Sequence, residues 1–485
     1  MSTPYISGSA DWLRNETFVL FAAAVSVALA ASAFYTPLPL VIVIGVPFLI
    51  YCLSRPYDLL LAMVFLIPFN FVFTIGEVPV AVELLKVFAW IPFLLTRKQR
   101  PQFIGSRFNK WFAVLAVIIL LSLVRAKDLP YTLKESVRLG SNLGLVYLTL
   151  NLVDSREKVF QLLRVLTVST FLVACYGFYQ WEIQGYGALF WIVNPRLNTN
   201  LAHYRDDFWP WRNRIISVLT SEMELGHYFN LCLPLGLFLW LTEGRRRLGS
   251  KWLLMTLAIL AGLVLTFTFG AWLALVGTFA LFVVIFAGEK RWKLILAGVL
   301  VLSLVTALVA YGPLRPYVEA KATGTEIGSL AWDAATRLIS WKMALQAWWS
   351  HPLLGVGIGN YEFIAAGEDY VLGPRSQGSS PHETYLYLLA NFGLVGTVSV
   401  LAILLSTIRS SLSIARTNSN LALVSLALAF ALATNMVGWF ADDSGFFGPH
   451  ASYLVWLLLG LGEVVSRIAV SGEAQAWALP SAQRV

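Results

Sequence analysis

The sequence has little charge for its length. Only 13% of its 485 residues are Asp, Glu, Lys or Arg, whereas 58% are hydrophobic and the mean hydropathy is +0.70. A soluble protein of this size carries about 25% charged residues, so the composition excludes a soluble globular protein. The apolar runs are continuous over roughly 18 to 20 residues and do not alternate with polar positions. They predict membrane-spanning helices and argue against a β-barrel.

Cysteine is scarce as well, and several catalytic motifs are missing. Cys52, Cys175 and Cys232 all lie in apolar runs, at spacings that fit neither a metal site nor a disulfide framework, so we expect small buried side chains. The sequence contains no HExxH, GxSxG or P-loop pattern. The stretch DDSGFFGPH (442–450) offers two carboxylates and a histidine, which is weak support for a metal site. We therefore predict no metal and no cofactor.

The apolar runs predict an all-α polytopic membrane protein with about 12 to 14 transmembrane helices in one domain, residues 1–485. The candidate spans lie near 17–34, 38–53, 57–75, 79–96, 109–125, 138–153, 158–181, 226–242, 252–269, 271–287, 292–311, 384–408, 421–440 and 451–466.

The distribution of basic residues predicts the orientation of these spans. The segments 96–110, 243–251, 289–293 and 408–416 are net basic, and by parity they all fall on one side of the membrane. Cytoplasmic loops carry an excess of Lys and Arg, so this side is predicted to be the cytoplasm, with both termini there. The net charge of +8 then reflects membrane topology and does not indicate a nucleic-acid partner.

Two long loops, 182–225 and 312–383, are predicted on the opposite, extracytoplasmic face. The second loop contains a helical pattern at 331–352, with Asp333 in the first turn and His351 and Pro352 at its end. It is followed by a string of alternating glycines, Gly355, Gly357 and Gly359. Because no strand precedes this string, it does not predict a dinucleotide site. We expect a tight turn that lets the backbone pass closely over its neighbours.

The stretch SPHETYLYLLANFGLVG (380–396) opens the next span. Ser380 suits an N-cap, Pro381 the first helical position, and Glu383 completes a capping box, which gives Glu383 a structural role. His382 would then lie at the positive end of the helix dipole, which favours a neutral imidazole that can accept a proton from a hydroxyl. The structural alternative is a histidine that only makes local hydrogen bonds.

Arginines on the predicted extracytoplasmic side run against the usual charge bias, and guanidinium groups suit phosphate. The arginines are Arg196, Arg205, Arg212 and Arg214 in the first loop and Arg337 in the second, where Lys342 adds a further cation. The alternative for the first loop is ion pairing with its own carboxylates, Asp206, Asp207, Glu222 or Glu224. The alternative for the second loop is a solvated helix face.

Two motifs in this region resemble a known family. HPLLGVGIGNYEF (351–363), followed by PHETYLYLLANFGLVG (381–396), resembles the O-antigen ligase and polymerase superfamily, which is similar in fold to class C glycosyltransferases. The resemblance implies a glycan transferase of the bacterial cytoplasmic membrane. It would take glycan from an undecaprenyl-diphosphate carrier and pass it to a glycan, lipid or protein hydroxyl, without metal or nucleotide sugar.

The resemblance also implies roles for particular residues. His382 would be the catalytic histidine, and Arg214 and Arg337, with Arg212 beside them, would bind the diphosphate. The supporting residues would be Glu383, Tyr385, Gly355, Gly357, Gly359 and Asn360. The sequence departs from the family pattern in three places: Glu383 replaces an Asn, Ser217 and Glu222-Met223 replace a Gly and a Pro-Asn, and Thr268-Phe269-Gly270 replaces Ser-Arg-Gly.

The function expected from this sequence is therefore glycan transfer on the extracytoplasmic face, with inversion at the anomeric carbon. Exposed tryptophans would stack on the sugars, from among Trp209, Trp211, Trp341, Trp348 and Trp349. The alternatives are a membrane transporter of the same superfamily, resembling inorganic-carbon transporters, and a non-catalytic assembly scaffold. A transporter would require ionisable residues or broken helices at mid-membrane, and the sequence offers few besides Glu83 and Lys86, which we expect near a rim.

Overall fold

The structure is a computed structural model. It describes residues 55–69, 74–75, 78–79, 86, 90, 93–94, 103–183, 214–243, 249–286, 330–361, 381–417, 421–447 and 450–478. The predicted spans at 17–34, 38–53 and 292–311, and most of the span at 79–96, lie outside these residues.

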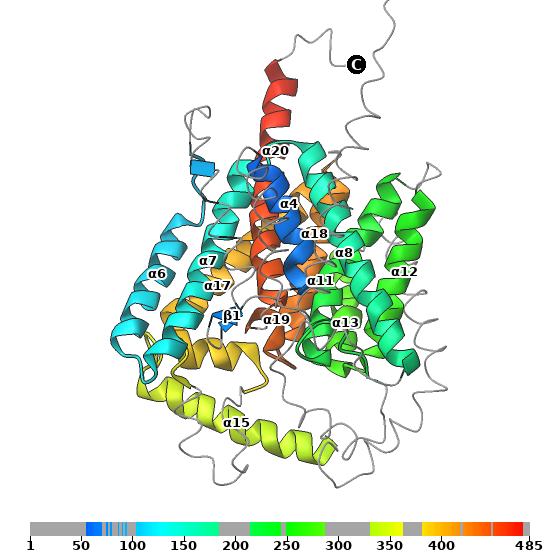
Figure 1. Cartoon of the computed structure of the whole chain (residues 1–485). Helices are drawn as coiled ribbons and strands as arrows, with labels where there is room; N and C mark the ends of the chain where they lie inside the picture. The colour runs from blue at the N-terminus through cyan, green and yellow to red at the C-terminus, as the bar shows by residue number, and fades with distance from the viewer. Residues whose placement is uncertain are drawn as a thin grey trace, which may run out of the picture.

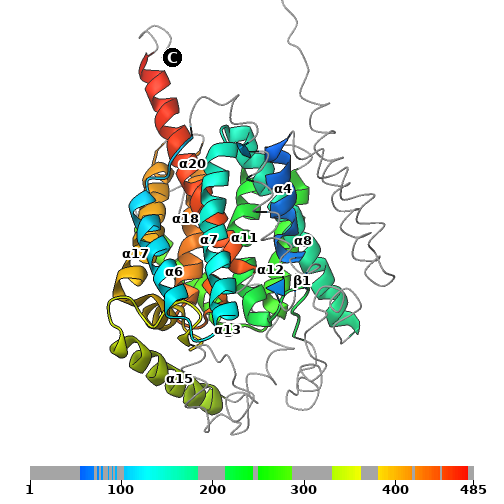
Figure 2. The same ribbon diagram turned by 60° about the vertical axis from the view of Figure 1, so that its left-hand side comes forward.

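The described residues form a bundle of roughly aligned helices with a further helix across one end (Figures 1 and 2). The bundle helices are α4 (Pro56–Leu66), α6 (Asn109–Val124), α7 (Leu129–Leu152), α8 (Arg156–Ile183), α11 (Glu222–Glu243), α12 (Gly249–Leu265), α13 (Phe269–Ile285), α17 (Thr384–Ala415), α18 (Ala422–Gly438) and α20 (Ala451–Ala478). Helix α15 (Leu330–Ser350) crosses the end, and the one-turn α19 (Ser444–Phe447) follows α18. The predicted all-α class is confirmed.

Strand structure in the described chain is confined to a hairpin of two-residue strands. β1 (Thr74–Ile75) pairs antiparallel with β2 (Val78–Pro79), with Ile75 opposite Val78. The hairpin follows α4 and the short 3-10 helix η2 (Ile67–Phe69), so the predicted span at 57–75 is helical over only part of its length.

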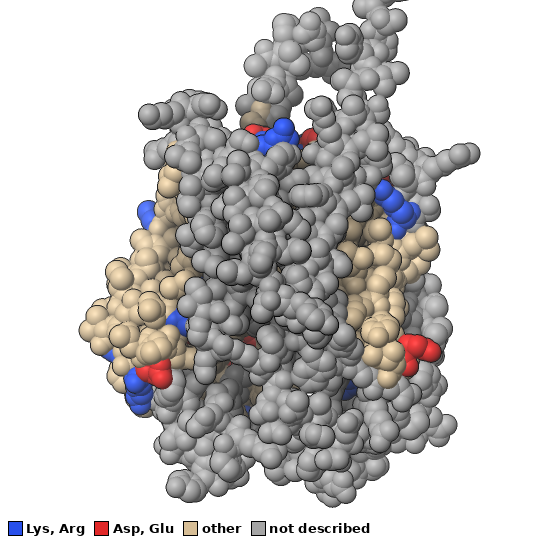
Figure 3. Space-filling view, viewed as in Figure 1, with Lys and Arg blue, Asp and Glu red and all other residues tan. Residues whose placement is uncertain are grey.

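Four helices of the described chain are long and apolar enough to cross a membrane: α8, α11, α17 and α20 over Ala451–Ser471. The shorter apolar helices α4, α6, α12, α13 and α18 pack among them. On the face seen in Figure 3, the described flanks of the bundle are mostly uncharged, and the charged side chains gather mainly towards its two ends. This distribution fits a molecule whose flanks face lipid.

Several helix boundaries differ from the prediction, and α20, for example, runs to Ala478 where the predicted span ended at 466. Helix α7 begins at Leu129, nine residues before the predicted start at 138, because Asp128 caps it by accepting a hydrogen bond from the Tyr131 amide at 2.8 Å and Pro130 occupies the first turn. Helix α17 continues to Ala415, so the basic segment 408–416 is mostly helix and was wrongly predicted as a loop. No glycine or proline interrupts the chain between 397 and 416.

The predicted basic segments nevertheless meet at one end of the bundle. The Arg107 side chain donates to Ser410 Oγ at 2.7 Å, and the Arg107 amide donates to Glu463 at 2.6 Å. The guanidinium of Arg416 lies over the ring of Phe286, 5.5 Å from its centroid. These contacts place the ends of three predicted cytoplasmic loops together, opposite the end that α15 covers (Figure 1).

Helix α17 is broken at Gly393, and the predicted glycine turn fits into the break. Gly393 has φ +63° and ψ −170°, which is not helical. The amides of Val356 and Gly357 donate to the carbonyls of Ala390 and Asn391 at 2.8 and 3.1 Å. A Cβ atom on Gly355, where φ is +68°, would lie 2.5 Å from the Asn391 carbonyl. The predicted close approach of backbones is confirmed, and it satisfies polar groups that the break in α17 frees.

Candidate active site

The turn at 439–442, between α18 and α19, joins the elements that carry the predicted site. Thr384, the first residue of α17, donates from its amide to the Trp439 carbonyl at 2.9 Å and from its hydroxyl to the Asp442 carbonyl at 2.8 Å. Arg337 of α15 donates to the Ala441 carbonyl at 2.7 Å. The start of α17 and the surface helix are therefore attached to one turn at one end of the bundle.

His382 lies immediately before α17, in an uncommon backbone conformation. Its φ is +48°, and its side chain is half-buried. The preceding carbonyl, of Pro381, accepts a hydrogen bond from Trp341 Nε1 of α15 at 3.0 Å. The left-handed region is sparsely populated by residues other than glycine, and residues held there cluster at functional sites. The packing of α15 and α17 thus holds His382 in a strained conformation at the rim of the bundle.

The helix cap differs from the predicted capping box. Helix α17 begins at Thr384, and Glu383 is itself the N-cap, accepting a hydrogen bond from the Leu386 amide at 2.5 Å. Pro381 therefore precedes the helix, while Ser380 lies outside the described residues. Glu383 caps its own helix, as predicted, but it is the N-cap residue itself, whereas the prediction gave that position to Ser380. Because a carboxylate reaches amides two or three residues ahead, Glu383 can serve as the cap without Ser380.

Burial and helix capping shift the pKa of the Glu383 carboxyl in opposite directions. Burial raises the pKa of its carboxyl above the ordinary value of 4.5, and hydrogen bonds from the Leu386 and Tyr385 amides work against that rise. Tyr385, predicted as a supporting residue, donates to the Met436 carbonyl at 2.7 Å and packs on the Trp439 ring at 5.6 Å. Both residues hold the start of α17 against the end of α18.

Arg214 is bound on three sides by the protein. Its Nε and Nη2 donate to the Thr266 and Phe267 carbonyls at 3.1 Å each, and its Nη1 lies 2.8 Å from Glu222 Oε1. The side chain is only 8% exposed. The predicted alternative, an ion pair with a carboxylate of the first loop, is confirmed for Glu222. Arg214 thus ties the first loop to the turn between α12 and α13. Arg212 lies outside the described residues.

The segment after Arg214 explains one departure from the family pattern. Ser217, where the family usually has glycine, has φ +53°. Its amide donates to Gln180 Oε1 at 2.7 Å, its carbonyl accepts from Gln180 Nε2 at 2.8 Å, and its hydroxyl donates to the Val173 carbonyl at 2.7 Å. Three hydrogen bonds to α8 compensate for the strain that a glycine would avoid.

Phe269 stands where the family pattern has the arginine of Ser-Arg-Gly, and other aromatic side chains pack near it. Phe269 packs edge-on against Trp272, with ring centroids 5.2 Å apart, and Phe267 stacks on Trp181 at 5.8 Å. A Cβ atom on the neighbouring Gly270 would lie 2.7 Å from the Ala441 Cβ, so the α13 start packs closely on the 439–442 turn. This part of the site presents aromatic surface where the family pattern has a cation.

The remaining predicted residues separate into structural and exposed ones. Asn360 accepts from the Lys127 amide at 2.9 Å and donates to the Val356 carbonyl at 2.9 Å, so it links the glycine turn to the start of α7. Gly357 and Gly359 have φ of +103° and +74° and belong to the same turn. Lys342 is exposed on α15, whereas Arg337 is half-buried against the 439–442 turn.

A buried polar pair lies under the site, and the sequence did not predict that its two residues meet. Glu224 of α11 is 1% exposed, and its Oε1 accepts from the His450 amide at 2.7 Å and lies 3.1 Å from His450 Nδ1. Thr220 Oγ1 donates to its other oxygen at 2.5 Å. His450 belongs to the stretch DDSGFFGPH, which offered weak support for a metal site. Among the described residues, no three His, Cys, Asp or Glu side chains gather as a metal site. Glu224 was predicted among the ion-pair partners of the first-loop arginines, and in the structure it pairs with His450.

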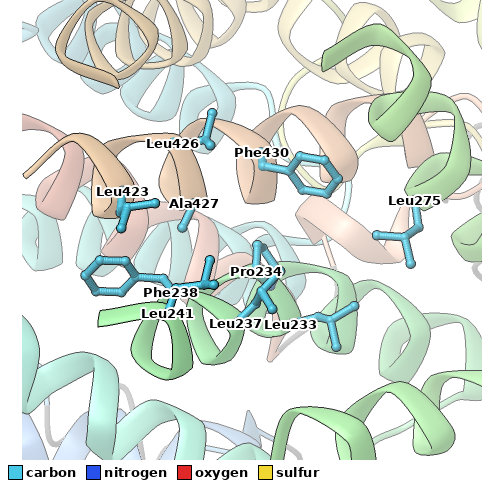
Figure 4. A pocket seen from close by; sticks show the side chains of 10 residues that line it. All are labelled: Leu233, Pro234, Leu237, Phe238, Leu241, Leu275, Leu423, Leu426, Ala427 and Phe430. Carbon is cyan, nitrogen blue, oxygen red and sulfur yellow. The ribbon is translucent and has the colours of Figure 1, made fainter. Parts of the chain in front are cut away.

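The apolar pocket in Figure 4 lies away from these residues. It is lined by side chains of α11, α13 and α18: Leu233, Pro234, Leu237, Phe238, Leu241, Leu275, Leu423, Leu426, Ala427 and Phe430. None of them can donate, accept or titrate, so the pocket offers no groups for chemistry. The polar candidates all lie at the other ends of these helices.

The fold and this site define a helical membrane protein that gathers its candidate polar residues at one end of the bundle, beneath a surface helix. Residues 254–401 match the family model described as O-antigen ligase. The matched segment runs from α12 into α17 and includes α15, the glycine turn and His382. The predicted resemblance to the O-antigen ligase/polymerase superfamily is therefore confirmed, and the family implies a glycosyltransferase-like ligase or polymerase activity. No curated protein sequence matches the chain.

Proposed function

We propose that this protein transfers a glycan from an undecaprenyl-diphosphate carrier to an acceptor hydroxyl, on the extracytoplasmic face of the bacterial cytoplasmic membrane. The following observation supports the proposal most strongly. The 439–442 turn holds together the segment that bears His382 and the helix that bears Arg337, and both lie within the segment that matches the O-antigen ligase family. The two long loops would form the face that meets the carrier and the acceptor.

In the proposed reaction, His382 accepts the proton of the acceptor hydroxyl as its oxygen attacks the anomeric carbon of the glycan. The bond between that carbon and the diphosphate oxygen breaks, and the lipid diphosphate leaves with the electron pair. Attack from the side opposite the leaving group inverts the anomeric centre. Because a diphosphate is already a stable anion, no general acid is required, and the imidazolium later releases its proton to water.

The arginines would act on the diphosphate in different ways. Arg337 binds the 439–442 turn through one nitrogen, and in this proposal the rest of its guanidinium contacts a phosphate near His382. Arg214 is held by two carbonyls and Glu222, which orients its charge and reduces its freedom to move. We propose that Arg214 affects the diphosphate through the electrostatic potential at the rim, and that Arg337 makes the closer contact with a phosphate.

A transporter of the same superfamily is the alternative, and one observation favours it. Lys86 is 1% exposed and donates to Asn142 Oδ1 at 2.8 Å, with its ammonium 3.8 Å from the centroid of the Tyr453 ring. An ionisable residue buried in a helical membrane bundle marks a candidate transport pathway. The rim position of His382 and Arg337 fits chemistry on a lipid substrate better.

Proteoliposomes that contain the purified full-length protein separate the two functions. The proposal predicts a glycan-bearing product when a lipid-linked oligosaccharide and a hydroxyl acceptor are supplied, with the anomeric configuration opposite to that of the carrier-linked sugar by NMR. Bicarbonate uptake into the same vesicles, without formation of any glycan product, would support the transporter instead.

A further inference from the structure

Three buried side chains beneath the site present polar atoms for which the described residues supply no hydrogen-bond partner. They are His227 of α11, Asn435 of α18 and Trp439 of the turn, and each is at most 1% exposed. The atoms are both ring nitrogens of His227, Asn435 Oδ1 and Trp439 Nε1. Buried polar atoms are rarely left unpaired in folded proteins, so a group of them in one place requires an explanation.

The three side chains surround one point at α19. A Cβ atom on Gly445 would lie 2.5 Å from Asn435 Oδ1, 3.1 Å from His227 Nδ1 and 3.2 Å from Trp439 Nε1. The Gly445 carbonyl accepts a hydrogen bond from Asn435 Nδ2 at 3.0 Å. Helix α19 can approach this polar group because residue 445 has no side chain.

The His227 ring also rests on Gly438, the last residue of α18. A Cβ atom on Gly438 would overlap His227 Cε1 and lie 2.9 Å from His227 Nδ1, whereas its next neighbour, Ala274 Cβ, is at an ordinary distance of 3.5 Å. The imidazole therefore lies against both Gly438 and Gly445. These two glycines bracket the 439–442 turn, whose carbonyls hold Thr384 and Arg337.

We propose that His227 is a positioning residue of the transfer site. Its ring supports the 439–442 turn from inside the bundle and so sets where the His382 segment and Arg337 lie. An imidazole suits this place because its Nδ1, Asn435 Oδ1 and Trp439 Nε1 all face the same point. The inference rests on the proposed function, because the turn matters for activity only if the site transfers glycan.

A pair of compensating substitutions tests the inference in the full-length protein in proteoliposomes. Gly438→Ala should lower turnover per folded molecule on the order of 10- to 100-fold, because its methyl group displaces the ring and the turn, and small displacements at a reacting site have effects of that size. His227→Ala should also lower turnover. The double variant should recover at least about tenfold over Gly438→Ala, since removal of the ring makes room for the methyl group.

The control is Gly277→Ala in α13. Its Cβ would lie 3.9 Å from Val437 Cγ1, an ordinary contact between α13 and the same helix, α18, and we expect turnover close to wild type. His227→Gln, which keeps a polar side chain of similar length, should retain more turnover than His227→Leu. Folded protein is counted by size-exclusion chromatography, so a purely structural role would change yield or melting temperature and leave turnover per folded molecule unchanged.

Two outcomes overturn the inference. If wild type is active and either single variant turns over at the wild-type rate per folded molecule, His227 does not position the site. If the double variant is as slow as the product of the two single effects, the ring and Gly438 are not coupled. A wild-type protein that forms no glycan product overturns the proposed function itself and, with it, this role for His227.

Discussion

At the scale of single residues, three non-glycine residues near the site have positive backbone φ angles: Ser217, Phe267 and His382. Each is held by hydrogen bonds of its neighbours: Ser217 by Gln180, Phe267 by Arg214 through its carbonyl, and the His382 segment by Trp341. Strained residues persist only where the surrounding structure holds them, and here the strain coincides with the predicted site.

The contacts of Arg214 predict that lysine cannot replace it. Lysine offers one flexible ammonium group in place of a planar fork that reaches Thr266, Phe267 and Glu222. Arg214→Lys should therefore lower turnover at least about tenfold and destabilise the fold by about 2 kcal/mol, the order of one lost charge-assisted hydrogen bond. Turnover and melting temperature in detergent are the measurements. Arg416→Lys, an exposed change at the other end, is the control and should behave as wild type.

The raised pKa of Glu383 predicts that the stability of the fold depends on pH. Because its folded pKa is raised above 4.5, its contribution to stability is fully present below pH 4.5 and is lost as the pH rises through the folded pKa. Glu383→Gln keeps an acceptor oxygen for the cap but carries no charge. The melting temperature of the variant relative to wild type should therefore rise with pH above 4.5. A difference that stays constant from about pH 4 to about pH 8 would contradict this assignment.

At the scale of elements, the glycine turn and the break in α17 form one unit. The amides of Leu394 and Val395 donate to the Pro352 and Leu353 carbonyls at 2.9 and 3.1 Å. Together with the bonds from the turn, they attach the break to the segment after α15. This unit determines where the first part of α17, and therefore His382, meets the surface helix.

Gly355→Ala tests that unit. An alanine there would need a left-handed conformation and would also collide with the Asn391 carbonyl and the Gly393 amide, so we expect destabilisation by at least about 2 kcal/mol. The measurement is the melting temperature and the yield of monodisperse protein. Gly140→Ala in α7 is the matched control, because its Cβ would meet nothing within 4 Å. It should be neutral or slightly stabilising, and an equal effect of both variants would contradict the account.

Local patterns predicted the elements well but not their ends. The apolar periodicity at 331–352 predicted α15, which runs from Leu330 to Ser350. The cap of α17 was misassigned because Ser380, Pro381 and Glu383 fit a capping box locally, whereas the hydrogen bonds from Thr384 to the 439–442 turn decide where the helix starts. That turn lies more than 50 residues away in the sequence.

At the scale of the whole molecule, the candidate site depends on contacts between distant segments. Glu224 and His450 are 226 residues apart in the chain, and Arg337 and Ala441 are 104 apart. No local pattern reveals such pairs, so the sequence singled out the motif residues His382 and Arg337 but did not predict the pairing of Glu224 with His450, the place of His227 or the 439–442 turn. The motifs lie where segments meet, and the partners in those contacts carry no motif of their own.

The predicted orientation can be tested by cysteine labelling in intact cells. Trp349 of α15 is 76% exposed, and the Glu157 side chain, at the start of α8, is 67% exposed. In a variant whose native cysteines are replaced by serine, Trp349→Cys should react with a membrane-impermeant maleimide from outside. Glu157→Cys should react only after the cells are permeabilised. The reverse pattern would place the candidate site in the cytoplasm.

The central claim is that His382 carries the transfer reaction, and its most direct test is turnover of a lipid-linked oligosaccharide by purified His382→Ala protein. His351→Ala is the matched control, because His351 is an exposed histidine just after α15 whose side chain makes a local hydrogen bond to Ser350 Oγ at 2.9 Å. We predict that His382→Ala folds normally but forms no glycan product, while His351→Ala turns over at nearly the wild-type rate. Turnover by His382→Ala close to that of wild type would contradict the account.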